Sequence, residues 1–504
     1  MTVFPAVPRP AASAARPWLR GVLLIAAAYW ILDLAILRAG VPHVLDDLWE
    51  YGLGAASLLA GHGFRTLVIH PPLWSLHDPA MTVPILVHGP LLPVVLAPWI
   101  GLFGLGALDG VAWLAAAFAV LAAFHTYRLG ARHIEPAVGA GAALLWTLAP
   151  LTLHAVHHDP GLIVGAAMIL LAADLLLRPQ PAALAGGLAL GAACLARPEM
   201  LPGVPLLLVA TERRAWPGAL VGAALMLSGW WWHDLQATGQ PFFNLSTYLV
   251  LGYSHRWPEL SILRDFELPP RAFPSAVVHG LFGIVGKGFA FLPHAIKRAI
   301  LAPTGATGWL AGIGLVAAYT RPRQKALATA GALLALVPLA VMSLTVYDAR
   351  YLTPFLPFWC LGAARGAETL ASFLPWWGRR PRTWLGLLLL LLLPALLPSI
   401  AEEARAAGGL RERLATERAA LRARFGAGDP RRAASVADSA DAARRLLFSD
   451  TPDFVAWTTA RPVVWVTRED WEALPETAAR DSGQFARPVR GDRTSTWFHA
   501  EGPR

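Results

Sequence analysis

Two adjacent carboxylates, Asp46 and Asp47, follow the first long apolar run of the chain, and Glu50 lies three residues further on. A carboxylate held beside a hydroxyl group can act as a general base, so this segment is a candidate for proton transfer. The alternative is structural, because Asp is a favoured N-cap residue and both side chains could cap a helix that begins near Trp49. One of the pair can cap the helix while the other does chemistry.

Two arginines lie at the edges of other apolar runs: Arg197 ends one run and Arg350 precedes another. An unpaired arginine is costly at such a position, whereas its planar guanidinium matches two oxygens of a phosphate. The alternatives are ion pairs, of Arg197 with Glu199 and of Arg350 with Asp348, or extension of the side chain to water. We take both arginines as candidate ligands of an anionic group.

Histidines are frequent in the same polar segments and raise the question of a metal site. None of them has the spacing of metal ligands on a demonstrable helix, and hydrogen bonds to lipid headgroups are the plainer interpretation. Asp159 follows one histidine pair and precedes Pro160, so it is either a functional acid or the N-cap of a helix. The histidines concerned are His62, His70, His77, His88, His154, His157, His158, His233 and His255.

Apolar helices must position these groups, because the composition is that of a membrane protein. Of the 504 residues, 56% are hydrophobic and 15% are charged, against about 25% charged in an ordinary soluble domain. Only three of the 42 basic residues are lysines, so there is no Lys-rich patch for nucleic acid. The two cysteines, Cys194 and Cys360, lie in separate apolar runs and form no disulfide framework.

Eleven of the apolar runs are candidate membrane spans. Crossing the hydrocarbon core takes about 20 apolar residues in a helix. Segment 83–106 is apolar enough to cross, but it contains four prolines, so we place it at the membrane surface. The predicted spans are 20–39, 108–127, 136–156, 160–178, 181–196, 200–211, 215–233, 301–320, 326–346, 352–372 and 383–400.

The short basic loops orient this bundle, because cytoplasmic loops carry the excess of Lys and Arg. With 83–106 at the surface, every short basic loop falls on the side of the N-terminus. We therefore predict a multi-pass protein of the inner (plasma) membrane with a cytoplasmic N-terminus and two long outer loops, 40–107 and 234–300. If 83–106 crosses instead, Arg128 and Arg132 fall outside and every later loop changes sides.

The predicted outer face carries all the concentrated polar chemistry. A transporter is expected to place polar groups along a path through the bilayer, whereas here they gather at one interface. Loop 234–300 mixes aromatic and basic residues, which is typical of amphipathic segments that lie on a lipid surface and cover a headgroup. This distribution favours an enzyme that works at the outer leaflet.

The composition changes near residue 400. Residues 401–504 contain 33 charged side chains, against 42 in the first 400 residues. The pattern from residue 444 to residue 467 predicts a strand, a short helix and a second strand. The fold class expected is an all-α polytopic membrane module, 1–400, with a small α/β domain outside the cytoplasm, 401–504.

The chain resembles the GT-C membrane glycosyltransferases, most of all the branch of protein O-mannosyltransferases and lipid A aminoarabinose transferases. The likeness covers most of residues 20–400, in order, and its specificity comes from the order and spacing of short motifs. The segments that carry it are Asp46-Asp47-Leu-Trp49-Glu50-Tyr51, Gly61-His62-Gly63, His88-Gly89-Pro90, Arg197-Pro198-Glu199, Trp232–Phe243 and Arg350-Tyr351-Leu-Thr-Pro354.

The resemblance implies that an acid of the first outer loop serves the acceptor. In this family an aromatic residue lies four positions after that acid and a Gly-x-Gly fourteen positions after it, which selects Asp47. The usual second acid would fall on Leu48, and Asp46 supplies a carboxylate one position earlier instead. Either the pair has moved by one residue or one acid is sufficient, so both remain candidate catalytic residues.

The resemblance also implies the reaction, in which a monosaccharide moves with inversion from a polyprenyl-phosphate carrier to a lipid, glycan or protein acceptor. Some relatives use a divalent metal ion near the first acid, so such an ion is a candidate cofactor here. The alternatives are a flippase for lipid-linked glycans and a polymerase or ligase that transfers whole glycans. The residues expected at the donor phosphate are Arg350, Arg197, His88 and Tyr351, and the secondary candidates are Asp159, His158 and Glu50.

Overall fold

The computed structural model describes most of the chain between residues 12 and 465. The described ranges are 12–36, 47–301, 306–346, 348–373, 397–402, 412–426, 428–433, 446–449, 451–465 and 484–485, with the single residues 394 and 405. Asp46 and most of the predicted span 383–400 lie outside the described residues.

The described chain is mainly helical. Its helices are α1 Ala12–Ile36, α2 Leu48–Leu59, α3 Leu91–Phe103, α4 Val111–His133, α5 Pro136–Thr147, α6 Pro150–His158, α7 Pro160–Leu176, α8 Ala183–Ala196, α9 Gly203–Val209, α10 Trp216–Thr238, α11 Phe273–Leu301, α12 Ala306–Tyr319, α13 Pro322–Leu334, α14 Leu336–Leu344, α15 Leu356–Ser372, α17 Pro430–Ala433 and α19 Pro452–Thr459. The strands are β1 Arg65–Thr66, β2 Val68–Ile69, β3 Val83–Pro84, β4 Leu447–Ser449, β5 Val463–Trp465 and β6 Gln484–Phe485.

Proline sets several of the helix boundaries. Pro136, Pro150 and Pro160 each occupy the first turn of a helix, where a missing N–H costs nothing and the fixed φ suits the helix. The predicted span 136–156 is therefore two helices, α5 and α6, that bend by 51° at their junction. The bend follows from Pro150, which cannot donate the hydrogen bond that would continue α5.

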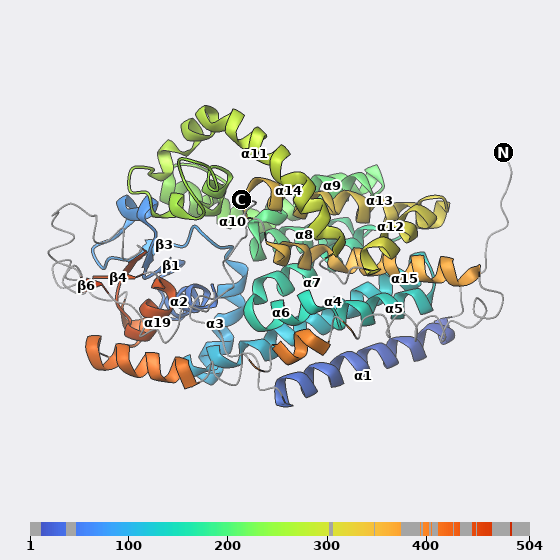
Figure 1. The fold of residues 1–504 in the computed structure, drawn as a ribbon, viewed down its shortest axis with the longest axis horizontal. Helices are drawn as coiled ribbons and strands as arrows, with labels where there is room; N and C mark the ends of the chain where they lie inside the picture. Colours follow the sequence, from blue (N-terminus) through green and yellow to red (C-terminus); the bar gives the residue numbers. More distant parts are fainter. Residues whose placement is uncertain are drawn as a thin grey trace.

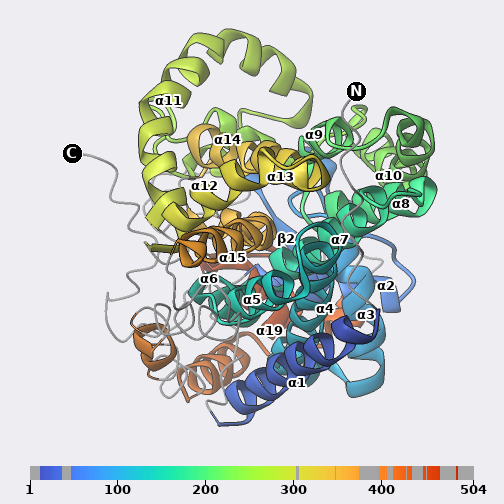
Figure 2. The same ribbon diagram turned by 90° about the vertical axis from the view of Figure 1, so that its right-hand side faces the viewer.

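The long helices form a bundle at one end of the molecule. In Figure 1 they run roughly along the long axis, while the strands, α2, α19 and α11 gather at the other end. Within the bundle α7 contacts both α8 and α4, and α15 contacts α5 and α12. Figure 2, viewed from the bundle end, shows α4, α5 and α7 between α1 on one side and α12 and α13 on the other.

Four helical segments of the described chain are long and apolar enough to cross a membrane, or five if the bent α5–α6 pair is one span. They are Arg16–Ala35, Leu105–His133, Pro270–Leu301 and Pro322–Leu344. The chain is therefore an integral, multi-pass membrane protein. The apolar helices α3, α7, α8 and α12 are shorter, at 10–17 residues, and the number of eleven spans stays a prediction.

One of these long segments lies where an outer loop was expected. The predicted loop 234–300 contains α11, a helix of 29 residues. Its residues are mostly exposed within the chain, and Phe282 is 92% exposed. The apolar run was hidden by the basic residues Lys287, Lys297 and Arg298, which made the segment as a whole read as polar.

A small parallel sheet joins the two ends of the sequence. Its strand order is β2-β5-β4-β6, and Val68 of β2 lies opposite Val463 of β5. Strands β4 and β5, with α19 between them, match the strand, helix and strand expected after residue 444. The sheet therefore contains segments from both sides of the predicted boundary at residue 401.

The C-terminal segment packs directly on α2. The ring of Trp49 lies 5.3 Å from that of Phe454 and 6.3 Å from that of Trp457, measured between centroids. Arg418 stacks over Trp49 at 5.1 Å and forms an ion pair of 2.7 Å with Asp109. Helix α2, which contains Glu50 and follows Asp47, is thus packed against residues more than 350 positions later in the chain.

Candidate active site

Asp47 occupies the N-cap position of α2 without acting as a side-chain cap. Its backbone oxygen accepts hydrogen bonds from the amides of Glu50 and Tyr51 at 3.1 and 3.3 Å, while its carboxylate makes no capping hydrogen bond among the described residues. The side chain is therefore free for another role. This geometry weighs against the capping alternative, which predicts such a bond.

The pKa of Asp47 is lowered by cations from three distant segments. Burial on its own raises the pKa of this carboxyl, but the charges of His88, Arg350 and Arg197 together lower it below its ordinary value, against the opposing charge of Glu50. Asp47 is therefore ionised at neutral pH. His88, Arg197 and Arg350 are the residues predicted to bind the donor phosphate. Their charges all act on Asp47, the predicted base.

Glu50 lies between two imidazoles. Its Oε2 atom is 3.4 Å from Nε2 of His88 and 3.7 Å from Nε2 of His70, and the residue is only 2% exposed. Burial raises the pKa of Glu50, but the two imidazoles lower it to about 2. Burial lowers the pKa of His88, yet Glu50 and Asp47 raise it overall.

The backbone beside His88 passes very close to another helix, at Gly89. A Cβ atom on Gly89 would lie 2.0 Å from the carbonyl oxygen of Leu195, at the end of α8. Only glycine allows this close approach, which brings the His88 segment next to the end of the helix that leads into Arg197.

Asp159 connects the two arginines. It is the N-cap residue of α7, yet its side chain makes no capping hydrogen bond among the described residues. Instead Oδ1 accepts a hydrogen bond from Nη2 of Arg197, and Oδ2 lies 3.8 Å from Nη1 of Arg350. The secondary acid predicted from sequence therefore holds both candidate phosphate ligands in one place.

The ion pairs considered as alternatives for the arginines are present as well. Nε of Arg350 lies 3.5 Å from Oδ2 of Asp348, and Nη1 of Arg197 lies 3.8 Å from Oε1 of Glu199. Both contacts are long. Arg350 stays 22% exposed at its side chain and stacks at 5.4 Å over the ring of Tyr351, so it can still reach an incoming anion.

Tyr51 fills the space between the acids and the arginines. Its ring lies 4.6 Å from that of His88. Gly161, in the first turn of α7, leaves a gap in which a Cβ atom would lie 3.2 Å from the Tyr51 hydroxyl and 3.1 Å from Nε of Arg197. The buried Tyr51 hydroxyl has no hydrogen-bond partner within the described part of the chain, so it is available to a bound ligand.

The histidine pair before Asp159 divides between two environments. Nε2 of His157 lies 2.9 Å from Oδ2 of Asp33 on α1, and both side chains are buried. The ring of His158, a secondary candidate, lies 4.8 Å from that of His154. The acid of the first predicted span thus bonds to a residue of another helix.

A third carboxyl comes from the C-terminal segment and was not singled out from the sequence. Asp453 lies in the first turn of α19, and its Oδ1 atom is buried without a hydrogen-bond partner among the residues described. Burial, followed by the charges of Glu50 and Asp47, raises the pKa of Asp453 well above its usual range. His70 was seen only as one of nine histidines, and no local pattern links it to Glu50.

Segment 245–250, which belongs to the predicted loop 234–300, is hydrogen-bonded to the chain just before His88. The amide of Leu245 donates a hydrogen bond of 2.5 Å to the carbonyl of Leu86, and Ser246 Oγ donates one of 2.9 Å to the carbonyl of Val87. Nζ of Lys287 on α11 donates to the carbonyl of Val250 at 2.8 Å. Segment 245–250 thus links α11 to the loop that contains His88.

The described residues do not form a metal site. Within them, no group of three or more His, Cys, Asp or Glu side chains is arranged to hold a metal ion. The carboxylate of Glu50 lies between the imidazoles of His70 and His88 and contacts both. The three side chains do not point toward one common position where a metal ion could bind. We therefore derive no chemical step through a metal ion.

No protein-family model matches the chain, and no curated protein matches it. Solved structures do. The oligosaccharyltransferase of Archaeoglobus fulgidus, in a complex with Zn and sulfate, matches with a TM-score of 0.53 and 14% identity over 88% of this chain and 62% of its own. ArnT from Cupriavidus metallidurans, bound to undecaprenyl phosphate, matches with a TM-score of 0.51 and 16% identity over 91% of this chain and 87% of its own.

A third structure, the A. fulgidus oligosaccharyltransferase AglB with an inhibitory peptide and a dolichol-phosphate, has a TM-score of 0.51 and 13% identity, covering 89% of this chain and 64% of its own. The chain thus spans less than two thirds of the archaeal protein's length. These matches confirm the predicted likeness at the level of the fold, which this chain shares with GT-C membrane glycosyltransferases.

Proposed function

We propose that the protein is an inverting glycosyltransferase that moves one sugar from a polyprenyl-phosphate carrier to an acceptor outside the cytoplasm. The convergence of Asp47, Arg197 and Arg350 supports this proposal most strongly. About 150 residues separate each of them from the next along the chain, yet the charges of both arginines act on Asp47. A base and a phosphate site in one enclosure are what such a transfer needs.

In the proposed step Asp47 takes the proton of an acceptor hydroxyl while the hydroxyl oxygen attacks the anomeric carbon of the sugar. The new carbon–oxygen bond forms on the face opposite the phosphate. The bond between the anomeric carbon and the phosphate oxygen breaks, and its electron pair leaves with the lipid phosphate. Arg350 and Arg197 stabilise that charge, and nearby carboxylates stabilise the cation-like anomeric carbon.

Donor binding would make Asp47 a stronger base. In the chain alone, the two guanidinium groups help to hold the pKa of Asp47 below its ordinary value. A phosphate bound to Arg197 and Arg350 offsets their charge, so the pKa of Asp47 rises when the donor is present. Proton transfer from the acceptor is then favoured only after the sugar donor has arrived, which limits unproductive chemistry.

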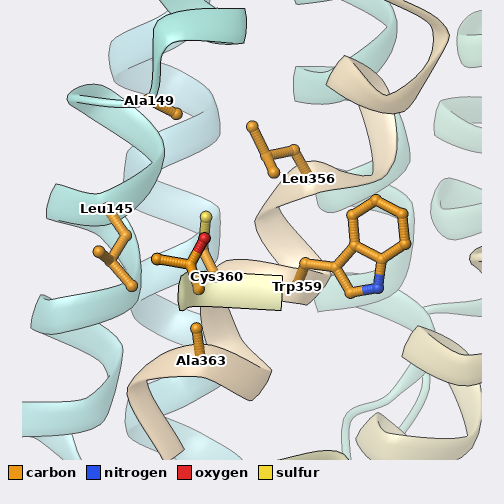
Figure 3. Close-up of a pocket in the computed structure, with 7 residues that line it drawn as sticks. Leu145, Ala149, Leu356, Trp359, Cys360 and Ala363 are labelled. Atoms are coloured by element: carbon orange, nitrogen blue, oxygen red, sulfur yellow. The ribbon is translucent and has the colours of Figure 1, made fainter. Parts of the chain in front are cut away.

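A small apolar recess lies at the α5–α6 bend (Figure 3). Its free volume is about 10 Å³, which is room for a single water-sized group and not for a prenyl chain. We therefore give this recess no part in the proposed reaction. It is lined by Leu145, Ala149, Thr307, Leu356, Trp359, Cys360 and Ala363.

The enclosure of the site supports transfer of a single sugar over transfer of an oligosaccharide. Glu50 and Arg197 are almost completely buried, at 2% and 5% exposed. An enclosed site of this kind favours a small transferred group.

The proposal is tested by incubating the purified protein in nanodiscs with a panel of polyprenyl-phosphate sugars and candidate acceptors. We expect release of the free lipid phosphate and a product extended by one sugar. Asp47→Asn should abolish both, and Asp78→Asn is a matched control, because Asp78 pairs with Arg65 at 3.0 Å and has no proposed role. Release from Asp47→Asn at the parental rate would contradict the assigned base.

The same assay separates the rival functions. A flippase moves the lipid-linked sugar across the nanodisc or vesicle membrane without breaking its bond to phosphate, so no free lipid phosphate appears. A polymerase or ligase releases a lipid diphosphate or transfers a chain of several sugars. Either result would replace the proposed monosaccharide transfer.

A further inference from the structure

A second ionic cluster lies at the far end of α7 and has no part in the proposed reaction. Asp174 is completely buried there. Its carboxylate oxygens lie 2.6 Å from Nη1 of Arg132, 3.3 Å from Nε of Arg128 and 3.4 Å from Nη2 of Arg178. Nδ1 of His125 lies 3.3 Å away. We name Asp174, Arg128, Arg132 and Arg178 the basic cluster.

The basic cluster carries more positive charge than its single acid can offset. Three guanidinium groups share one carboxylate, and Arg323 adds a fourth by donating a hydrogen bond of 2.9 Å to the carbonyl of Arg132. With Arg323 counted, the surplus is three positive charges. Such a surplus at the ends of membrane helices attracts anionic lipid headgroups.

Several donors of the basic cluster remain available. Arg128 uses only Nε toward Asp174, so neither of its terminal nitrogens has a partner among the described residues. Arg178 engages Nε and Nη2 with Asp174, which leaves Nη1. The three arginine side chains are 25–35% exposed, so they are open to a ligand from outside the fold.

The position of the basic cluster along α7 suggests that it lies at the level of the lipid headgroups. Asp174 lies 15 residues after Asp159 on the same helix, which corresponds to about 22 Å of helix length, most of the thickness of a hydrocarbon core. Arg128 and Arg132 lie on α4, Arg178 lies two residues after the end of α7, and Arg323 lies on α13. A basic pocket between the ends of membrane helices is suited to an anionic lipid headgroup.

We propose that the basic cluster is a binding site for the phosphate group of an anionic glycerophospholipid in the leaflet opposite the candidate active site. The two terminal nitrogens of Arg128 and Nη1 of Arg178 bind the phosphate oxygens, and Asp174 holds both side chains in position. Arg132 acts mainly as the internal partner of Asp174. Its Nη1 atom contacts the carboxylate of Asp174 and donates a hydrogen bond of 2.9 Å to the backbone carbonyl of Asp174.

A neighbouring set of charges on the same side of the bundle shows the contrast. Arg365 pairs with Glu368, and Glu135 lies within the field of Arg365 and Arg321. Two acids and two bases balance there without a ligand. The surplus therefore belongs to the basic cluster and is not a general property of this end of the bundle.

The test reconstitutes the full-length protein in vesicles of phosphatidylcholine, alone or mixed with phosphatidylglycerol. We expect phosphatidylglycerol to raise the thermal unfolding temperature and to be retained in native mass spectra. The double variant Arg128→Gln/Arg178→Gln should lower that retention by about tenfold or more. The control is Arg213→Gln/Arg214→Gln, which removes two basic residues outside the basic cluster. Arg214 pairs with Glu212 at 2.5 Å. This variant should retain the lipid.

Two outcomes would overturn the proposal. One is equal stability and retention in both vesicle types. The other is an equal shift produced by inorganic phosphate in phosphatidylcholine vesicles, which would assign the cluster to a free anion. If the glutamine variant does not fold, Arg128→Lys/Arg178→Lys keeps the charges but not the forks, and parental lipid retention in it would contradict bidentate binding.

Discussion

The two ends of α7 carry two buried aspartates with opposite surroundings. Asp159 binds Arg197 and Arg350, which come from segments far apart in the chain, and further carboxyls lie close by. Asp174 binds Arg128 and Arg132 of α4 and Arg178, which follows the end of α7. The first centre has an excess of acids and unpartnered polar atoms, and the second has an excess of guanidinium groups.

The difference indicates two kinds of work. Around Asp159 and Asp47, buried polar atoms such as the Tyr51 hydroxyl and Oδ1 of Asp453 have no partner among the residues described, which is costly unless a substrate uses them. Around Asp174 the carboxylate is surrounded by three guanidinium groups and the imidazole of His125. We therefore expect the centre around Asp159 and Asp47 to change its partners during a reaction, and the centre around Asp174 to hold them.

The largest effect that separates the two centres should come from Asp47→Asn. Loss of a general base lowers the rate by about 100- to 10,000-fold, so release of lipid phosphate should fall close to the background. Asp174→Asn should leave the rate per folded molecule unchanged. The comparison fails if both variants lose activity to the same degree while both remain folded, as judged by gel filtration in detergent.

Arg350→Gln should have the next largest effect. Removing a group that stabilises charge in the transition state lowers turnover by about 100-fold or more. Arg350→Lys should recover only part of this, because lysine lacks the planar fork. The measurement is the rate of lipid phosphate release at saturating donor. Parental turnover in Arg350→Gln would return Arg350 to a purely structural pair with Asp348.

Asp174→Asn should lower stability and leave chemistry intact. The asparagine keeps the shape of the side chain but removes the buried charge that the arginines share, which costs about 2 kcal/mol in the free energy of unfolding. Thermal unfolding in phosphatidylcholine vesicles measures it. An unchanged unfolding temperature would mean that the ion pairs around Asp174 contribute nothing measurable.

Asp453 tests whether the C-terminal segment belongs to the outer centre. Burial and the charges of Glu50 and Asp47 raise the pKa of Asp453 well above its usual range, which favours the neutral carboxyl, so Asp453→Asn should be nearly silent. Asp453→Ala removes the hydrogen-bonding group and should raise KM for the acceptor by about tenfold. Equal KM values for the alanine variant and the parent would exclude the residue from the site.

The smallest effect expected is a change in the pH profile. The pKa of His88 is raised by Glu50 and Asp47, so the imidazolium is stabilising below its ordinary pKa of about 6.5. That stabilisation is lost as the pH rises through the raised value. Activity should therefore decline by a few fold on the alkaline side, and His88→Gln should flatten that decline. An identical alkaline limb in the variant would assign it to another group.

Residue type and chain position were sufficient to select Asp47, His88, Arg197 and Arg350 as candidates, because charged groups at the ends of apolar runs are conspicuous. Whether they meet depends on the packing of helices, which no single segment encodes. Asp453 was missed because its helix carries no motif and becomes relevant only through contact with α2.

Two features of the fold differ from expectation for local reasons. The bend at Pro150 was readable, since proline interrupts a helix, but the length of the apolar run suggested one span. Helix α11 was read as loop because a few basic side chains interrupt an apolar face. Average polarity over a long segment hides a helix whose charges all lie in its second half.

The pairing of Val68 with Val463 has a consequence for the order in which the molecule is made. During synthesis the first outer segment leaves the ribosome nearly 400 residues before the strand that it must meet. Domains form in the order of translation, and contacts between distant parts of a chain form slowly. Nascent chains stopped before residue 447 would insert their helices yet lack both the sheet and Asp453, so a prematurely terminated chain would reach the membrane without a finished centre.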